Sequence, residues 1–400
     1  MARVSRIFRE IAPEIGGSLG DLGILLPFAI LLIVNNGLSP VTVFFFVGLH
    51  YLITGYYFRI PLPIQPLKAA TMIAIVTGAS PQLIGATGIL MGVILLILTF
   101  GKAAALMGRI FTKPIVRGIQ LAVGIFLTQK GLALIMDPPD TLLTIGSLEA
   151  PWGPILLAIT SGVIILISSA YHKISVATLV ILPAGVLMGL LMAPAAQFPS
   201  LESQFTIPLL LHPSWDDYIT AFSLMVIPQL PLTFANSIVS THYIAHDYFG
   251  DRAKRVTPRA LCASLGIGNL IGGIFGAMPC CHGAGGLTAH YSFGARSGKA
   301  TIFLGIVFLI TGLLFGDSVH ALFALIPAAI LGALLIYVGI QHSMMIRDVL
   351  PHRQAALVAM LIGGISVGTH NIAIGFVTGM VVGLLMKIFP AMMAQRKESP

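Results

Sequence analysis

Long apolar stretches, separated by short polar connections, run along nearly the whole chain. Fourteen of them are candidate membrane spans, lying near residues 15–35, 40–58, 61–77, 81–100, 114–133, 152–170, 175–193, 218–243, 258–276, 280–292, 300–316, 320–340, 353–369 and 371–388. A regular helix needs about 20 apolar residues to cross a bilayer, whereas barrel strands are shorter and alternate in polarity. The pattern predicts an all-α membrane protein with about fourteen transmembrane segments, of which 61–77 and 280–292 are too short to be regular helices.

The composition is that of a chain surrounded by lipid. Hydrophobic residues make up 56% of the 400 residues and charged residues 9%, and the mean hydropathy is +0.96. A soluble domain carries about 25% charged residues. We therefore expect an integral membrane protein that has no soluble domain.

The distribution of charge predicts the orientation. With the N-terminus placed in the cytoplasm, every lysine and arginine except Lys68 and Lys130 falls in an inner loop or a terminus. The outer loops carry acidic residues, namely Asp137, Asp140, Glu149, Glu202, Asp216, Asp217 and Asp317. Basic residues favour the cytoplasmic side, which places both termini in the cytoplasm and the protein in the plasma (inner) membrane. The formal charge of +8 then orients the chain and indicates no nucleic-acid partner.

The two halves of the chain share a faint repeat. Two pairs of segments resemble each other: "GILLPFAILL" (23–32) with "IPQLPLTFAN" (227–236), and "IPLPIQPLKAAT" (60–71) with "GAMPCCHGAGGLT" (276–288), which puts Pro63 over Pro279. The matching spans are seven apart, and an odd separation gives the halves opposite orientations, as in the inverted repeats of secondary transporters. The expected division is a first repeat over 1–193, an outer linker over 194–217 and a second repeat over 218–400.

Both short spans contain helix breakers. Three prolines fall within 61–66, and Pro279 lies in the other short span. Proline interrupts a helix but suits its first turn, so we expect extended chain over 61–65, a short helix from near Pro66 and a second half-helix from near His282. Irregular backbone in a bilayer is tolerated where it lines a protected cavity. Two half-helix N-termini that face each other carry partial positive charge and free N–H groups, which predicts an anion site.

Three segments resemble the signature blocks of a known family. They are "PIQPLKAAT" (63–71), "PQLPLTFANSI" (228–238) and "GAMPCCHGAGGLTAHYSFGARSG" (276–298). They are similar to the molybdate transporter family related to SulP sulfate permeases, and the similarity extends through most of the chain. The resemblance implies the fourteen-helix fold of the uracil permease, with core and gate domains, and transport of a tetrahedral oxyanion between spans three and ten. SulP permeases usually add a STAS domain, which we expect this chain to lack.

The candidate substrate-binding residues lie at the two breakers and on span eight: Gln65, Leu67, Lys68, Gln229, Thr233, Asn236, Cys281, His282, Gly283, Ala284 and Gly285. A lysine at mid-membrane needs a partner or a cavity, so Lys68 either attracts a dianion or pairs with Asp21 of the first span. Gln65 either donates to the oxyanion or caps the half-helix. The polar residues of span eight share one face at i, i+4, i+7, where they either line the substrate or hydrogen-bond to another helix.

The second breaker leaves further alternatives open. His282 either donates to the anion, carries a co-transported proton because its pKa is easily tuned, or is a satisfied buried histidine. Asp21 is the other candidate for coupling. The adjacent residues Cys280, Cys281 and His282 cannot easily converge on one tetrahedral ion, so we expect no metal and no cofactor. Gly283 and Gly285 let a ligand approach the backbone closely.

The predicted function is molybdate transport by alternating access, and the alternative is a sulfate or nucleobase secondary transporter on the same fold. We do not expect an enzyme, because the chain has no P-loop and offers no Ser/His/Asp or Cys/His/Asn set that can be placed together. The expected partners are molybdate, tungstate, sulfate more weakly, and the lipid bilayer. A homodimer is left open.

Overall fold

The structure is a computed structural model that describes residues 13–100, 112–138, 142–143, 152–171, 174–192 and 207–397. Residues 194–206 of the predicted linker (194–217), together with Asp140, Glu149 and Glu202, lie outside these residues. The first half contains η1 (Leu19–Asp21), α2 (Leu22–Val34), α3 (Pro40–Phe58), β1 (Gln65–Pro66), α4 (Lys68–Thr77), α5 (Pro81–Thr99), α7 (Lys113–Met136), α8 (Trp152–Ala170) and α9 (Ile174–Met192).

The second half begins with one long, interrupted helix. It consists of α10 (Trp215–Thr220), η3 (Ala221–Val226), α11 (Ile227–Leu232), η4 (Thr233–Ser240), α12 (Thr241–Phe249) and the short turn η5 (Gly250–Ala253). The elements that follow are α13 (Pro258–Ile274), β2 (Cys280–Cys281), α14 (Ala284–Ser292), α15 (Lys299–Ala324), α16 (Ala328–Met344), η6 (Met345–Asp348), α17 (Arg353–Gly368) and α18 (Ile372–Lys397).

Each of the fourteen predicted spans corresponds to a helix or to a two-residue strand followed by a short helix. Eight helices in the described part of the chain are long and apolar enough to cross a membrane. The predicted end of span eleven, at residue 316, agrees with a kink at Phe315 (φ −132°, ψ 17°), where two helical segments meet within α15. The second segment ends at Ala324, and Pro327 N-caps α16. Predicted span twelve, 320–340, therefore contains a break that the sequence did not indicate.

Helix packing shows the inverted repeat directly. In a seven-segment repeat, α3 corresponds to α13, and α5 corresponds to α15. α3 packs along α15, and α13 packs along α5, which is the same contact with the two repeats exchanged. The fifth and twelfth spans, α7 and α16, are counterparts that pack on each other. These are the pairings that a two-fold axis between the repeats requires.

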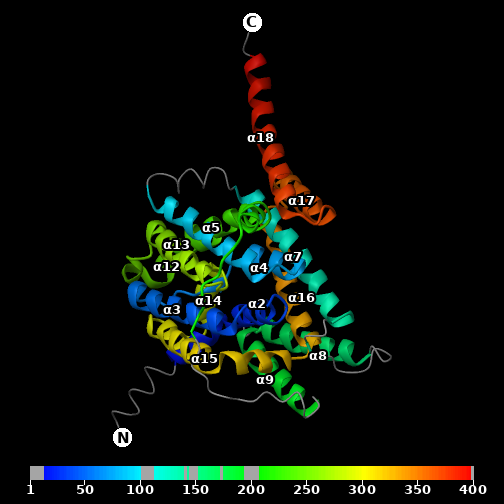
Figure 1. Cartoon of the computed structure of the whole chain (residues 1–400). Helices are drawn as coiled ribbons and strands as arrows, with labels where there is room; N and C mark the ends of the chain where they lie inside the picture. Colours follow the sequence, from blue (N-terminus) through cyan, green and yellow to red (C-terminus); the bar gives the residue numbers. More distant parts are fainter. Residues whose placement is uncertain are drawn as a thin grey trace.

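The helices form two groups, which we call the core bundle (α2–α5 with α10–α15) and the gate bundle (α7–α9 with α16–α18). In Figure 1, α3, α12 and α13 lie on the left, α7, α8 and α16 lie on the right, α2 and α4 lie between them, and α15 runs below them. Helix α18 extends beyond the body. Contacts between the bundles run through α2 with α9, α4 with α7, and α11 with α7 and α18.

The two breakers meet at the centre of the core bundle. Strands β1 and β2 pair antiparallel, with Gln65 opposite Cys281 and Pro66 opposite Cys280. Gln65 and Cys281 are as far apart in the chain as Pro63 and Pro279, so they occupy equivalent positions in the two repeats. Because these equivalent residues pair with each other, the axis that relates the repeats passes through this residue pair. Each half-helix begins two residues later than predicted, at Lys68 and at Ala284, because these residues are taken up by the strand pair and the caps after it.

Close contacts between the paired helices depend on glycine. A Cβ on Gly273 of α13 would lie 2.6 Å from the backbone nitrogen of Ile89 and 2.7 Å from the carbonyl oxygen of Gly85, both on α5. Backbone atoms cannot move aside as a flexible side chain does. Gly273 therefore sets the distance between α13 and α5.

We predict that Gly273→Ala lowers the stability of the protein by about 1–3 kcal/mol, the range observed for overpacking a close contact. Gly364→Ala in α17 is the control, because a Cβ there meets no atom within 4 Å. Thermal unfolding of both variants in detergent measures the difference. Equal melting temperatures for the two variants would contradict the assigned contact.

Candidate substrate site

The site is built around the starts of α4 and α14. Leu67, the residue before α4, donates its backbone N–H to the carbonyl of Pro279 (2.9 Å), which extends the strand pairing. Asn269 of α13 holds the other strand, since its Oδ1 accepts from the Cys280 N–H (2.7 Å) and its Nδ2 donates to the Cys280 carbonyl (2.8 Å). The chain thus fixes both half-helix N-termini on one small, hydrogen-bonded platform. Sequence reasoning missed Asn269, whose signal was a lone amide in an apolar span.

The N-terminus of α4 is capped by a side chain from span eight. Gln229 Oε1 accepts from the backbone N–H groups of Ala69 (2.8 Å) and Ala70 (3.1 Å). Its Nε2 donates to Thr233 Oγ1 at 2.9 Å. Gln229 lies in α11, between two π-helical segments, and prolines at 228 and 231 flank it. Such π-bulges inside helices occur frequently at functional sites. Gln229 of span eight therefore reaches the first breaker, and Thr233, one turn further on, holds the Gln229 amide.

The N-terminus of α14 faces a buried carboxylate. The Gln65 amide donates to Asp21 Oδ1, and both side chains are fully buried. A Cβ on Gly286, in the first turn of α14, would lie 2.7 Å from both Asp21 Oδ1 and Gln65 Nε2. Asp21 Oδ2 and Gln65 Oε1 are buried, and neither has a hydrogen-bond partner among the described residues. A carboxylate and an amide thus occupy the position where a half-helix attracts negative charge.

Lys68 brings positive charge to the same place. It is the first residue of α4 and is half-buried. Within the described part of the chain, its ammonium makes no ion pair and no hydrogen bond, although Asp21, Cys281 and His342 lie within its electrostatic reach. Direct pairing with Asp21, one of the two interpretations of Lys68, is therefore not seen in this conformation. A buried cation without a direct partner is expensive in a membrane, which suits a position that meets an anion.

The His282 ring is fully occupied by hydrogen bonds to the protein. Its Nδ1 lies 3.0 Å from the Pro63 carbonyl oxygen and its Nε2 lies 3.0 Å from Ser264 Oγ. The backbone carbonyl of His282 accepts from Thr241 Oγ1 at 2.7 Å. In this conformation neither ring nitrogen is available to an anion, and the ring joins the two breakers.

The cysteines of the second breaker also contact backbone groups. The Cys281 thiol donates to the Pro66 carbonyl (3.4 Å) and the Cys280 thiol donates to the Met278 carbonyl (3.1 Å). Together with the His282 ring they point to three different partners. They do not converge on one point, as a metal site would require.

The remaining candidates differ in exposure. Gly283 caps α14, and Ala284 is its first residue and is buried. Gly285 is exposed and a Cβ there would meet open space. Asn236 is half-buried, and its carbonyl accepts from Thr241 Oγ1. Thr71, one turn into α4, has a buried hydroxyl oxygen with no hydrogen-bond partner among the described residues, and no pattern in the sequence singles it out. The open approach to the α14 N-terminus is therefore at Gly285.

Two half-helix N-termini at the meeting point of two inverted repeats define a secondary transporter. A sequence model of the family described as "Molybdate transporter of MFS superfamily" matches residues 13–127 and 221–341. These segments make up more than half of the chain, so the chain belongs to this family.

Named relatives cover nearly the whole chain. It is 30% identical to Molybdate transporter 2 of Arabidopsis thaliana, over 97% of this chain and 90% of that protein. It is 29% identical to Molybdate transporter 1 of Chlamydomonas reinhardtii, over 92% of this chain and 90% of that protein.

Solved structures share the fold at low sequence identity. The transmembrane domain of the cyanobacterial bicarbonate transporter BicA superposes with a TM-score of 0.62 at 16% identity, over 94% of this chain and 97% of that chain. The murine solute carrier 26 family member A9 anion transporter, in its inward-facing state, superposes with a TM-score of 0.66 at 17% identity, over 95% of this chain and 69% of that chain. The fold is therefore the seven-segment inverted repeat of these transporters. The family's description names the MFS superfamily instead, but the two halves of an MFS transporter have the same orientation in the membrane.

We predict that Gly283→Ala lowers the stability of the unliganded protein and that Gly285→Ala does not. A Cβ on Gly283 would overlap the Gln65 carboxamide, whereas a Cβ on Gly285 meets no atom within 4 Å. Displacing Gln65 separates it from Asp21, and a lost hydrogen bond to a charged group weakens stability by about 1.5–3 kcal/mol. Melting temperatures of the two purified variants test this. A Gly283→Ala protein as stable as Gly285→Ala would show that Gln65 is not held in this place.

Proposed function

We propose that this protein carries molybdate across the membrane by alternating access, with the anion bound between the N-termini of α4 and α14. The observation that carries the proposal is the convergence of two half-helix N-termini and the unpaired ammonium of Lys68 in a chain that belongs to a molybdate transporter family. The alternative is a sulfate or nucleobase transporter on the same fold.

In the proposed site, Lys68 supplies the positive charge and the backbone supplies directed donors. The N–H groups of Ala69 and Ala70 now bond to the Gln229 amide oxygen. The Gln229 amide oxygen is uncharged and occupies the position that an oxygen of the anion would take. A molybdate oxygen brings more negative charge to the same donors and replaces Gln229, whose amide is then free to donate to the anion. Charge-assisted bonds of this kind are about twice as strong as neutral ones.

At the other half-helix, the exposed position at Gly285 leaves room for a second molybdate oxygen. Gln65 is close enough to the α14 N-terminus to donate to the anion once it leaves Asp21. Thr233 and Asn236 line the span-eight side, and Leu67, Cys281 and Ala284 form the buried wall. We assign to His282 the role of holding the breakers together, because both of its ring nitrogens are engaged.

Asp21 is the proposed coupling group. An ionised carboxylate beside the α14 N-terminus repels a dianion, and protonation removes that repulsion. Binding of the anion and of a proton would then favour each other. The proposed location is the plasma (inner) membrane with both termini in the cytoplasm, as the basic loops predict, and the chain acts without a cofactor or nucleic acid. Whether two copies of the chain form a homodimer is left open.

The substrate is tested by uptake of labelled molybdate into proteoliposomes, with and without an imposed proton gradient. We expect tungstate to compete almost fully, sulfate weakly and uracil not at all. Sulfate is smaller and would reach one half-helix while leaving the other under-satisfied, and an unmade buried hydrogen bond costs about 1–3 kcal/mol. That corresponds to roughly a tenfold to hundredfold loss of affinity. Sulfate competing as well as tungstate would indicate a general sulfate permease, and competition by uracil would indicate a nucleobase transporter.

The role of Lys68 is tested by a double-mutant cycle with Asp21. We expect Lys68→Ala to weaken molybdate binding by roughly tenfold or more, since hydrogen bonds to charged groups contribute about 1.5–3 kcal/mol. If Lys68 mainly neutralises Asp21, adding Asp21→Asn restores binding or stability. If it mainly binds the anion, the two effects add. Calorimetric titration of each purified variant with molybdate measures the four affinities. An unchanged molybdate affinity in the Lys68→Ala variant would show that Lys68 does not bind the anion.

A further inference from the structure

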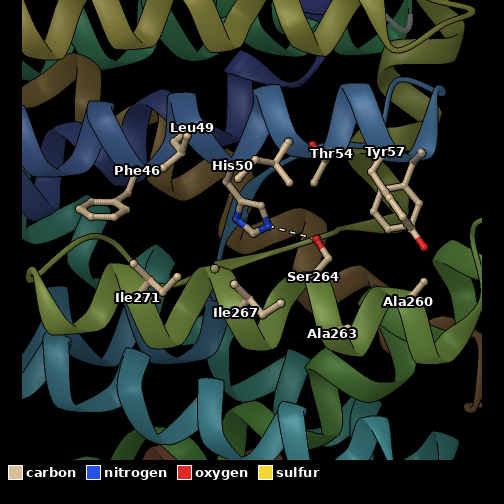
Figure 2. A pocket seen from close by; sticks show the side chains of 13 residues that line it. Phe46, Leu49, His50, Thr54, Tyr57, Ala260, Ala263, Ser264, Ile267 and Ile271 are labelled. Carbon is tan, nitrogen blue, oxygen red and sulfur yellow. Dashed lines mark hydrogen bonds between the residues drawn. The ribbon is translucent and has the colours of Figure 1, made fainter.

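A groove of about 340 Å³ runs along the core bundle between α3 and α13. In Figure 2, Phe46 and Ile271 lie at one end and Tyr57 and Ala260 at the other, with His50 near the middle. Ile53, Ile267 and Ile271 line it and are 44–54% exposed. A cavity of this size suits a small ligand and is too small for a helix from another protein. In a membrane-spanning bundle, the molecules that reach such an apolar face are lipids.

One end of the groove is basic. Arg255 donates to the Tyr57 carbonyl at 2.7 Å, and its guanidinium lies 5.6 Å from the centre of the Tyr57 ring, which lines the groove. Arg59 and Arg259 are exposed, and each adjoins in sequence a residue that lines the groove. No acidic residue of the described chain is among the residues that line it. An apolar groove with Arg255 at one end, and with Arg59 and Arg259 next in sequence to residues that line it, is complementary to an acyl chain attached to an anionic headgroup.

The middle of the groove has a polar floor. His50 Nε2 lies 3.3 Å from Ser264 Oγ, and Ser264 Oγ lies 3.0 Å from His282 Nε2. A smaller adjoining hollow is lined by His50, Asn269 and Cys280, so the floor reaches β2. These polar atoms bond to one another and leave the walls apolar. The floor therefore supports a hydrocarbon chain and does not by itself recruit a polar ligand.

We propose that this groove binds one anionic phospholipid, with an acyl chain between α3 and α13 and the phosphate at Arg59, Arg255 and Arg259. This end of the groove belongs to the side that the basic loops predict to be cytoplasmic, and anionic lipids concentrate in the cytoplasmic leaflet. The proposal does not depend on which anion is transported. Lipid in the groove packs against the helix that holds Ser264 and Asn269, and both residues contact the second breaker.

The test uses the full-length protein in detergent, incubated with equal amounts of phosphatidylglycerol and phosphatidylcholine, with native mass spectrometry to count retained lipids. We expect the wild-type protein to retain phosphatidylglycerol preferentially. Ile267→Trp fills the groove and should abolish that retention. Its control is Ile306→Trp on α15, where the isoleucine is 47% exposed compared with 50% for Ile267 and lines no cavity described here. Ile271→Trp fills the same groove one turn away and replaces Ile267→Trp if that variant does not accumulate.

The headgroup is tested with Arg259→Gln against Arg353→Gln, an exposed arginine at the start of α17. Each basic side chain near an anionic lipid surface contributes roughly a factor of five in affinity. Arg259→Gln should therefore lower the retention of phosphatidylglycerol by about fivefold, and Arg353→Gln should leave it unchanged. Equal retention by Ile267→Trp and Ile306→Trp would overturn the proposed groove. Equal retention of the two lipids by the wild-type protein would overturn the anionic specificity.

Discussion

The pairing of β1 with β2 is the interaction on which the rest of the structure depends. Lipid offers no hydrogen bonds, so a chain that leaves its helix at mid-membrane has to satisfy those backbone groups within the protein. Here each breaker supplies partners for the other, with Gln65 opposite Cys281 and Leu67 bonded to Pro279. A single breaker could not do this. The inverted repeat therefore provides more than symmetry, because it brings two incomplete spans together so that each completes the other.

Side chains provide hydrogen-bond partners for further backbone groups of the two breakers. Asn269 bonds to both backbone groups of Cys280, the Tyr51 hydroxyl donates to the Ile64 carbonyl at 3.1 Å, and the His282 ring meets the Pro63 carbonyl. The first N–H groups of the two half-helices lie beside this platform. Gln229 accepts from those of Ala69 and Ala70 in α4, and Asp21 with Gln65 lies against α14. In the proposed site, an anion would have to compete with these polar atoms of the protein, which keep the donors of α4 paired when no anion is bound.

The sequence was sufficient to predict the membrane spans and the inverted repeat, because each depends on a local signal. Apolar length identifies spans, and proline identifies the two breakers. The location of the substrate site, inferred from a lysine at mid-membrane, stays a prediction. The strand pairing was not predicted, since two residues of extended chain carry no periodicity. Nor could the sequence choose between a substrate-lining role and a hydrogen-bonding role for Gln229, or between an available ring and a satisfied ring for His282. Those choices depend on contacts such as Ala69 to Gln229 and His282 to Ser264, which join residues far apart in the chain. The predicted end of span eleven agrees with the kink at Phe315, whereas the break before α16, at Pro327, falls inside predicted span twelve.

All of the groups that define the candidate site belong to the core bundle. Asp21 ends η1 beside α2, Gln65 and Lys68 lie on β1 and α4, Gln229 lies on α11, and Gly285 lies on α14. The strand pair and the hydrogen bonds from Gln229 tie these elements into one unit. The gate bundle meets this unit through packing contacts, such as α7 against α4 and α11, and His342 of α16 lies within electrostatic reach of Lys68. In the proposed carrier, a movement between the bundles would therefore leave the paired strands and the half-helices that they join together as one unit, and would change which side of the membrane the proposed site faces. This division suits a carrier better than a channel, because the binding groups travel together and no continuous pore has to open through the paired strands.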